Sequence, residues 1–489
     1  MPSWNRAKVG AKFFLTVHPE LEISQAVHEG KSVTVLGYIL DPERPEADNR
    51  AIAHSLLDFL RTCASMEAFP KATYGYGGRW VVIADDGRDA RMFHDAMGYR
   101  QIFHTDYLRE LWCASQPAII AETLSLTPDA EALSQYENTE WYQGDKECIP
   151  WPAFETSFRE ISHLLPNFYL DLNSGRCRRY WPDAALKILS LDECVEQNAR
   201  LLTHLITAAS KRYRMAFTIT AGWDTRLLLA ASRELSSQIY YFSIQRSGRQ
   251  YERDVHIPDR LLRKLELNHH IVRFPATMDP TFQEIYKRSV TAAHSLSGLM
   301  AQGLYDQYPD GRLCVTGNAF EITRVRFRIA EGRSPTAKDL ARVSGFGWGG
   351  EMADMMAENS FVTKAWSKWL SKLQDCEIYN VHIMDLFYWE HWAGNFGAMG
   401  QAEWDIIKDE FTPYSCRSLL TNMLGVDERF RDHDEPVLHR ALAARMWPQA
   451  LCEPVNPTSP LIRVKELIKQ ILVKLKLYTP LREAMKVFQ

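Results

Sequence analysis

Two short stretches of the chain place acidic and hydroxyl side chains directly after an apolar run. Residues 216–225 read Ala-Phe-Thr-Ile-Thr-Ala-Gly-Trp-Asp-Thr, and residues 313–321 read Leu-Cys-Val-Thr-Gly-Asn-Ala-Phe-Glu. The apolar residues predict a buried strand in each stretch, and the small residues after them predict a tight turn. Asp224 and Glu321 therefore follow the ends of two strands. A pair of carboxylates is suited to a Mg²⁺ ion that bridges phosphate oxygens.

The first turn also predicts a site for an anion. A strand that leads into a helix through small residues directs backbone N–H groups and the positive helix end at one point, which suits a phosphate. We expect the helix to begin at Asp224, with Thr220 and Thr225 adding hydroxyl donors. A plainer interpretation stays open for each acid: Asp224 can simply favour a helix N-terminus, and Glu321 can be a solvated turn residue.

The elements around these stretches predict a parallel sheet. We expect a helix over residues 191–213, strands over 239–244 and 269–274, and a helix ending over 260–267. Alternating strands and helices form parallel sheets that bind ligands at the carboxyl ends of the strands. His269 and His270 are adjacent on a predicted strand and should face opposite sides, so they do not predict a shared metal ion.

The rest of the chain divides into an amino-terminal and a helical carboxy-terminal part. Residues 1 to about 183 predict a layered α/β domain with mostly antiparallel strands, and residues 184–489 predict a second domain. The expected amino-terminal elements are strands over 12–17, 32–40, 79–84, 91–94, 101–104 and 168–172 and a helix over 50–61. The expected carboxy-terminal helices cover 361–373, 381–391, 401–408, 415–424 and 436–446.

Composition limits the classes of function. A formal charge of −4 over 489 residues gives no general attraction to nucleic acid, so we expect no nucleic-acid partner. The nine cysteines are scattered and odd in number, which favours reduced thiols and a cytoplasmic location. No window reaches the roughly 18 apolar residues of a membrane span, so we expect no transmembrane segment.

Several phrases resemble the asparagine synthetase-like family. Thr220-Ala221-Gly222-Trp223-Asp224-Thr225 resembles the pyrophosphate loop S-G-G-x-D-S of N-type ATP pyrophosphatases, with Ala221 in place of a glycine. Phe242-Ser243-Ile244 resembles the phrase whose backbone holds adenine, and residues 251–254, including Asp254, stand where the family has an acidic phrase. Glu321 stands where the family has its second magnesium ligand. This resemblance implies a PP-loop ATP pyrophosphatase domain, of the adenine nucleotide alpha hydrolase-like fold, that binds ATP and Mg²⁺.

The amino-terminal part resembles the glutamine amidotransferase domain of the same family. The similar phrases are residues 78–83, 94–103, 113–116 and 165–181. The resemblance implies an Ntn-hydrolase-like (N-terminal nucleophile) fold. The family's nucleophile is a cysteine exposed as the first residue, whereas Pro2 and Ser3 follow Met1 here and the first cysteine is Cys63. We therefore expect this domain to lack glutaminase activity.

The resemblance implies an AMP-forming amide ligase. The substrate would be a small-molecule, sugar or peptide carboxylate, and the nitrogen would come from ammonia or a substrate amine. The family's catalytic lysine corresponds to about Asn456, so Lys465 or Lys469 would have to supply the ammonium. Arg324, together with Arg326 and Arg328, forms a pyrophosphate clamp if the segment is extended and spreads over the surface if it is helical.

Other interpretations stay open. The chain can be a catalytically impaired nucleotide-binding protein with a regulatory role, as the alanine in the loop and the missing lysine suggest. A nucleobase-modifying PP-loop transferase is disfavoured by the acidic balance and the lack of a cysteine pair. The basic amphipathic tail, residues 461–489, can pack on its own domain or contact a membrane surface or a partner. A homodimer is left open as well.

Overall fold

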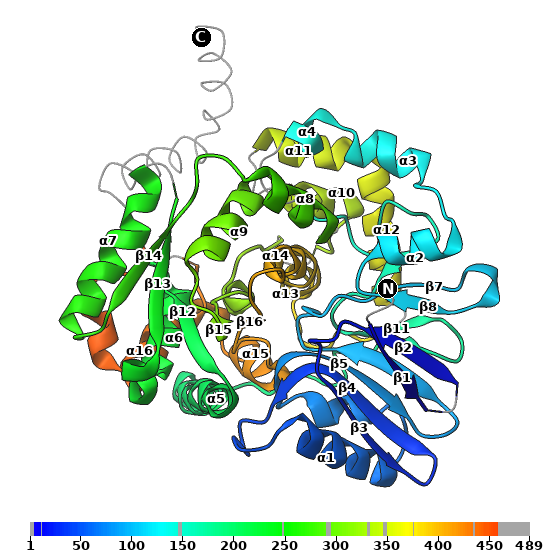
Figure 1. Ribbon diagram of the computed structural model, residues 1–489, viewed down its shortest axis with the longest axis horizontal. Coiled ribbons are helices and arrows are strands. Elements are labelled where there is room, and N and C mark those ends of the chain that lie inside the picture. Colours follow the sequence, from blue (N-terminus) through cyan, green and yellow to red (C-terminus); the bar gives the residue numbers. More distant parts are fainter. Residues whose placement is uncertain are drawn as a thin grey trace, which may run out of the picture.

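A computed structural model describes residues 4–10, 12–144, 149–246, 249–289, 295–329, 333–345, 350–374, 376–433 and 436–457. The basic tail, with Lys465 and Lys469, lies outside the described residues. Within them the fold is mixed α/β, with antiparallel sheets in the amino-terminal part and one parallel sheet after it (Figure 1). This confirms the expected α/β class.

A six-stranded antiparallel sheet dominates the amino-terminal part, with strand order β11-β10-β6-β5-β4-β3. Helix α1 (Asn49–Thr62) packs on one face through Ile52, Leu56 and Leu60, and a second apolar cluster covers the other face. Two-sided burial explains why the central strands are apolar almost throughout. The strands are β3 (Ile23–His28), β4 (Lys31–Leu40), β5 (Gly77–Asp85), β6 (Ala90–His94), β10 (Phe168–Asp171) and β11 (Cys177–Arg179).

Smaller elements complete the amino-terminal part. A two-stranded sheet pairs β1 (Asn5–Val9) with β2 (Phe13–Val17), and a three-stranded sheet has the order β8-β7-β9. Strands β1, β3, β8, β9 and β11 were not predicted, because they are short or largely exposed and their residues alternate only weakly. The other elements are β7 (Phe103–Thr105), β8 (Trp112–Ala114), β9 (Ser162–His163), α2 (Pro117–Leu124), α3 (Ala130–Ala132) and α4 (Glu140–Gly144).

A five-stranded parallel sheet forms the centre of the remaining chain, with strand order β14-β13-β12-β15-β16. All four strand pairs are parallel. From β12, the next two strands, β13 and β14, extend the sheet in one direction, whereas β15 and β16 extend it in the other. The boundary between β12 and β15 is therefore the topological switch point. The strands are β12 (Arg214–Thr218), β13 (Tyr240–Gln245), β14 (His269–Arg273), β15 (Arg312–Val315) and β16 (Glu410–Phe411).

Helices cover both faces of the parallel sheet. Apolar residues of α5, α6, α7 and α16 (Val437–Met446) pack with Phe217, Tyr241 and Val315 in one cluster. Apolar residues of α9 and α14 pack with Phe242 and Cys314 in another cluster. Figure 1 shows α7 and α16 at the side of the sheet away from the antiparallel sheet. The bounds are α5 (Leu191–Arg212), α6 (Trp223–Ala231), α7 (Arg249–Lys264), α8 (Pro280–Ser289), α9 (Ser295–Gln307) and α14 (Gly397–Trp404).

The remaining chain is helical, as its texture predicted. The helix expected over 381–391 begins as α13 (Ile383–Phe387) and continues as the π-helix η7 (Tyr388–Phe396). The others are α10 (Ala337–Ser344), α11 (Gly350–Glu358), α12 (Ser360–Gln374), α15 (Arg417–Leu424) and α16 (Val437–Met446). None of the helices in the described ranges is long and apolar enough to cross a membrane. Every cysteine in the described part of the chain is a free thiol.

Candidate functional site

The two acidic stretches meet at the switch point of the parallel sheet. Asp224 lies in the first turn of α6, directly after β12, and Glu321 lies in the 3-10 helix η5 (Phe320–Thr323), after β15. Gly317 leads into this second turn, and a Cβ atom there would lie 2.6 Å from the Cβ atom of Asp224. A side chain at position 317 would therefore collide with Asp224, and glycine allows the two turns to approach.

The two carboxylates interact electrostatically. Burial raises the pKa of Asp224 to about 6, the Thr225 backbone N–H opposes that rise, the Glu321 carboxylate adds to it, and the Arg324 guanidinium lowers it. Asp224 keeps part of its surface exposed, so burial does not isolate it from solvent. A carboxyl group whose pKa is raised by burial and by a second acid, at the carboxyl ends of two parallel strands, is a recognised mark of a functional site.

Glu321 has one engaged and one unengaged oxygen. Its Oε1 atom accepts a hydrogen bond from Arg324 Nη1 at 2.7 Å, and Arg324 is itself buried. Its Oε2 atom is buried without a hydrogen-bond partner among the described residues. Thr316, the last residue before Gly317, also has a buried hydroxyl without such a partner. The two turns therefore contain buried polar atoms that no described residue hydrogen-bonds.

The loop between β12 and α6 carries several backbone N–H groups that already have acceptors. Thr220 N–H donates to Thr225 Oγ1 at 3.0 Å, and Gly222 N–H donates to Thr220 Oγ1 at 3.1 Å. Ala221 N–H donates to Asp254 Oδ1 at 3.3 Å. Helix α6 begins at Trp223, one residue before the predicted start, and Gly222 is its N-cap. The loop is thus preorganised by its own hydroxyls and by one acid from α7.

A carboxy-terminal segment, residues 448–457, packs against the same loop. Asn456 N–H donates to the backbone oxygen of Ala221 at 2.9 Å, and Asn456 has a positive φ of 43°. The buried Arg226 of α6 donates to the backbone oxygens of Ala450, Glu453 and Pro454. Asn456, near which the sequence resemblance led us to expect a lysine position, therefore lies beside the loop but carries no charge.

The end of β13 lies next to the loop. Ile219 N–H donates to the backbone oxygen of Phe242 at 2.8 Å, where β12 pairing ends, while β13 continues to Gln245. The backbone groups of a strand alternate between its two edges, so those of Ile244 face the same edge as those of Phe242. The Ser243 hydroxyl donates to the Ile219 oxygen at 2.6 Å and contacts His269 Nε2 at 2.8 Å.

The two histidines of β14 have separate partners. His269 contacts Ser243 Oγ, whereas the His270 ring stacks on Tyr240 with a centroid distance of 3.9 Å. The doublet therefore does not converge on one point. Among the described residues, no group of three or more His, Cys, Asp or Glu side chains is arranged to hold a metal ion.

The arginine segment is neither a helix nor a free clamp. Arg324 donates to Glu321 and to the backbone oxygen of His433, and Arg326 contacts the His433 ring. Arg328 instead pairs with Asp385 and Glu428. Arg324 pairs with Glu321, and its charge also lowers the pKa of Asp224.

Two tyrosines near the acids were not anticipated from the sequence. The Tyr414 hydroxyl donates to the backbone oxygen of Asp224 at 3.0 Å. Burial, with a further contribution from Glu321, raises the pKa of Tyr388. Both belong to segments more than 60 positions beyond Glu321, so only the folded chain brings them to the site.

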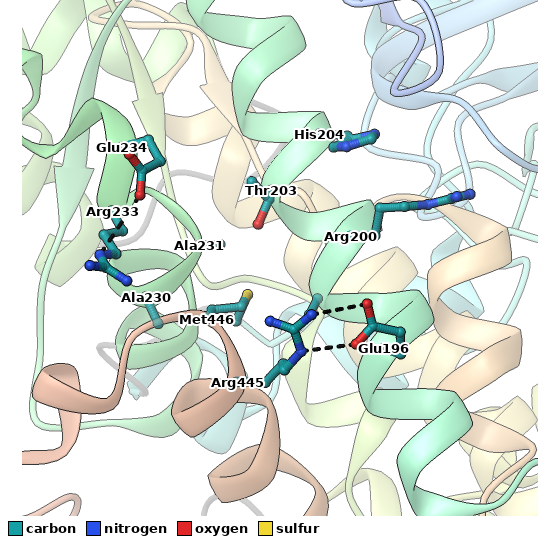
Figure 2. A pocket seen from close by; sticks show the side chains of 11 residues that line it. Glu196, Arg200, Thr203, His204, Ala230, Ala231, Arg233, Glu234, Arg445 and Met446 are labelled. Carbon is teal, nitrogen blue, oxygen red and sulfur yellow. Dashed lines mark hydrogen bonds and ion pairs between the residues drawn. The ribbon is translucent and has the colours of Figure 1, made fainter.

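A further hollow lies at the other end of α6. It has a volume of about 290 Å³ and is bordered by α5, α6 and α16, and Figure 2 shows Glu196 and Arg445 paired across it. Its arginines already have carboxylate partners: Arg445 pairs with Glu196, Arg233 with Glu234 and Arg200 with Glu43. The pair of turns at the strand ends is the stronger candidate, because it combines an acid of raised pKa with buried polar atoms that lack a partner among the described residues.

The residues present fit a magnesium–phosphate complex. The unpartnered Oε2 atom of Glu321 is a hard oxygen ligand, and Asp224 supplies a second carboxylate beside it. Mg²⁺ is commonly held by one or two carboxylates while phosphate oxygens and water complete its shell. A pair of carboxylates is therefore sufficient for that mode of binding.

Comparisons with known proteins give little direct information. No family model matches the chain, and no curated protein matches it. A solved structure titled glutamine phosphoribosylpyrophosphate (PRPP) amidotransferase from B. subtilis, complexed with ADP and GMP, matches with a TM-score of 0.20 and 8% identity. That alignment covers 62% of this chain and 64% of the other, so this chain spans less than two thirds of that protein. A similarity of this size does not place the chain in a family.

Proposed function

We propose that the chain is an ATP-dependent, AMP-forming amide ligase related to asparagine synthetases. Asp224 and Glu321 would hold Mg²⁺, the 220–225 loop would bind the pyrophosphate portion of ATP, and the backbone of Phe242–Ile244 would contact adenine. The observation that carries the proposal is the convergence of two acids at the switch point of a parallel sheet.

The chemistry of each residue supports its proposed role. Mg²⁺ would neutralise charge on the phosphates and so favour attack by a substrate carboxylate at the α-phosphorus. Arg324 would keep Glu321 in place through Oε1 while Oε2 stays available. The Ile244 backbone groups on the edge that β12 leaves can bond an adenine ring. Lys465, proposed as the catalytic ammonium, remains a prediction.

The amino-terminal part would adopt an Ntn-hydrolase-like fold without glutaminase activity. Its six-stranded antiparallel sheet, with apolar clusters on both faces, supports this proposed fold. The nitrogen would then come from ammonia or from an amine on a substrate. A covalent glutaminase requires an activated nucleophile, so glutamine hydrolysis measured on the full chain tests this part of the proposal.

The proposal is tested by ATP–pyrophosphate exchange with a panel of small-molecule, sugar and peptide carboxylates, together with AMP release in the presence of ammonia or amines. We expect exchange with at least one class of carboxylate, independent of glutamine. Asp224→Asn and Glu321→Gln should each lower it by about 100-fold or more, because each removes a metal ligand. Glu234→Gln, at the other end of α6, is the matched control and should keep full activity.

A nucleotide-binding protein without catalysis is the second candidate. The uncharged Asn456 beside the loop favours it, since the family that the sequence resembles has a lysine at about this position. Binding of Mg²⁺-ATP without exchange for any carboxylate would support this candidate and contradict the ligase. Ammonia release from glutamine would contradict the proposed loss of glutaminase activity.

A further inference from the structure

Ala221 is the loop residue whose backbone groups are both bound by other segments. Its N–H donates to Asp254 Oδ1 of α7, and its oxygen accepts from Asn456 N–H. The acceptors of the Thr220 and Gly222 N–H groups, by contrast, are hydroxyls of the loop and α6 themselves. Hydroxyls can rotate when a ligand arrives, but Asp254 places a fixed negative charge at the point where an anion would bind.

Helix α7 is held in position beside the loop. Arg260 Nη2 and Lys264 Nζ pair with Glu453 at 2.8 and 2.7 Å, and Glu453 is buried. The backbone of Glu453 is in turn bound by Arg226 of α6. Helices α6 and α7 therefore both bind the segment around Glu453, and Asp254 belongs to a helix that is tied to that segment.

From this geometry we propose that Asp254 determines which anions the loop accepts. Its carboxylate occupies the Ala221 N–H and, with Asp224 and Glu321, repels a phosphate that brings no cation. A phosphate bound to a divalent metal would be attracted by the same three acids and would displace Asp254 from the N–H. The inference rests on the proposed function, since it assigns a selectivity to the same loop.

The inference differs from simple metal binding. Asp224 and Glu321 would favour a metal complex by coordinating it, whereas Asp254 acts by competing for a backbone donor. Removing Asp254 should therefore strengthen binding of the metal-free anion, and removing either proposed metal ligand should weaken binding of the metal complex. The two kinds of variant change affinity in opposite directions.

The test uses inorganic pyrophosphate as the probe, with Mg²⁺ or with a chelator, and isothermal titration calorimetry on the full chain. We expect the wild type to bind the magnesium complex at least tenfold more tightly than metal-free pyrophosphate. Asp254→Asn and Asp254→Ala should strengthen binding of the metal-free form about tenfold, because hydrogen bonds to charged groups have about that effect. Glu252→Gln removes an exposed acid from the same helix and should change neither affinity.

Hydrogen exchange of the Ala221 amide gives an independent readout without ligand. Asp254→Ala should accelerate this exchange relative to wild type and Glu252→Gln, because it removes the acceptor. Unchanged selectivity in both Asp254 variants, with wild type still binding magnesium pyrophosphate, would overturn this inference alone. If no protein bound pyrophosphate in either form, the proposed function would fail together with it.

Discussion

At the scale of single residues, Asp224 combines an unfavourable environment with a useful position. Burial and the neighbouring Glu321 both disfavour its ionised form, and its side chain occupies space that Gly317 and Gly222 leave open by having no side chain. A Cβ atom at Gly222 would lie 2.3 Å from Asp224 Oδ1. A residue that is retained for binding or catalysis often lowers the stability of the fold.

Asp224→Asn should therefore stabilise the fold above pH 6. The pKa of Asp224 is about 6 in the folded protein, above its ordinary value of 3.8. Above pH 6 the ionised carboxylate therefore lowers the free energy of unfolding, and below about pH 4, where both states are protonated, this effect disappears. We expect a gain of about 1–2 kcal/mol at pH 7.5, reduced for the partial exposure of Asp224, that shrinks as the pH falls.

Urea unfolding of both proteins at pH 7.5, 6 and 4.5 measures this difference. Asp58→Asn changes an acid whose side chain is 73% exposed and should give no gain at any of these pH values. A gain that grew toward low pH, or a loss of stability at pH 7.5, would contradict the assigned environment of Asp224.

At the scale of elements, helix α6 both positions the candidate site and binds the carboxy-terminal segment. Its first turn carries the acid and the loop, and two residues later Arg226 binds the carboxy-terminal segment through three backbone oxygens. The loop conformation and the placement of Asn456 are therefore coupled through one short helix.

Arg226→Gln should loosen the 448–457 segment. The shorter amide cannot reach all three backbone oxygens, so we expect a loss of about 2–3 kcal/mol in the free energy of unfolding and faster exchange of the Asn456 amide. Arg263→Gln, which alters an arginine of α7 with 76% side-chain exposure, should cost less than about 0.5 kcal/mol. Equal losses in the two variants would show that Arg226 does not act as an anchor.

At the scale of the whole molecule, buried polar groups join the antiparallel sheet to the later helices. Glu390 of the π-helix η7 pairs with Arg179 of β11 and accepts from Trp369 Nε1 at 2.8 Å and from Asn167 Nδ2 at 2.9 Å. Asn167 also accepts from Arg417 Nη1 of α15 at 2.6 Å. Segments more than 200 positions apart thus share one hydrogen-bond network.

Glu390→Gln should destabilise the whole chain in one cooperative step. It leaves the buried Arg179 without its charge partner, and breaking a buried pair in this way costs about 3–5 kcal/mol. Far-UV circular dichroism and tryptophan fluorescence should report coincident transitions in the wild type and the variant. Glu358→Gln, at an acid with 72% side-chain exposure, should cost less than about 1 kcal/mol, and separate transitions in the wild type would contradict the coupling.

The long, strongly patterned elements were predictable from the sequence. Helix α1 was expected over 50–61 and spans Asn49–Thr62, and α5 was expected over 191–213 and spans Leu191–Arg212. Both have apolar residues at helical spacing, and their helix formation depends on near neighbours. The domain boundary at 183/184 stays a prediction, although the antiparallel sheet ends at Arg179 and the parallel sheet begins at Arg214.

The sequence by itself determined the strand–turn–acid pattern at Asp224 and Glu321, because local apolar runs and small residues fix where strands end. The tertiary structure alone decided that these acids lie together, that Asp254 and Asn456 bind Ala221, and that Arg328 is drawn away to Asp385. These contacts join residues tens to hundreds of positions apart. Their formation depends on strand order and helix packing, which no local pattern encodes.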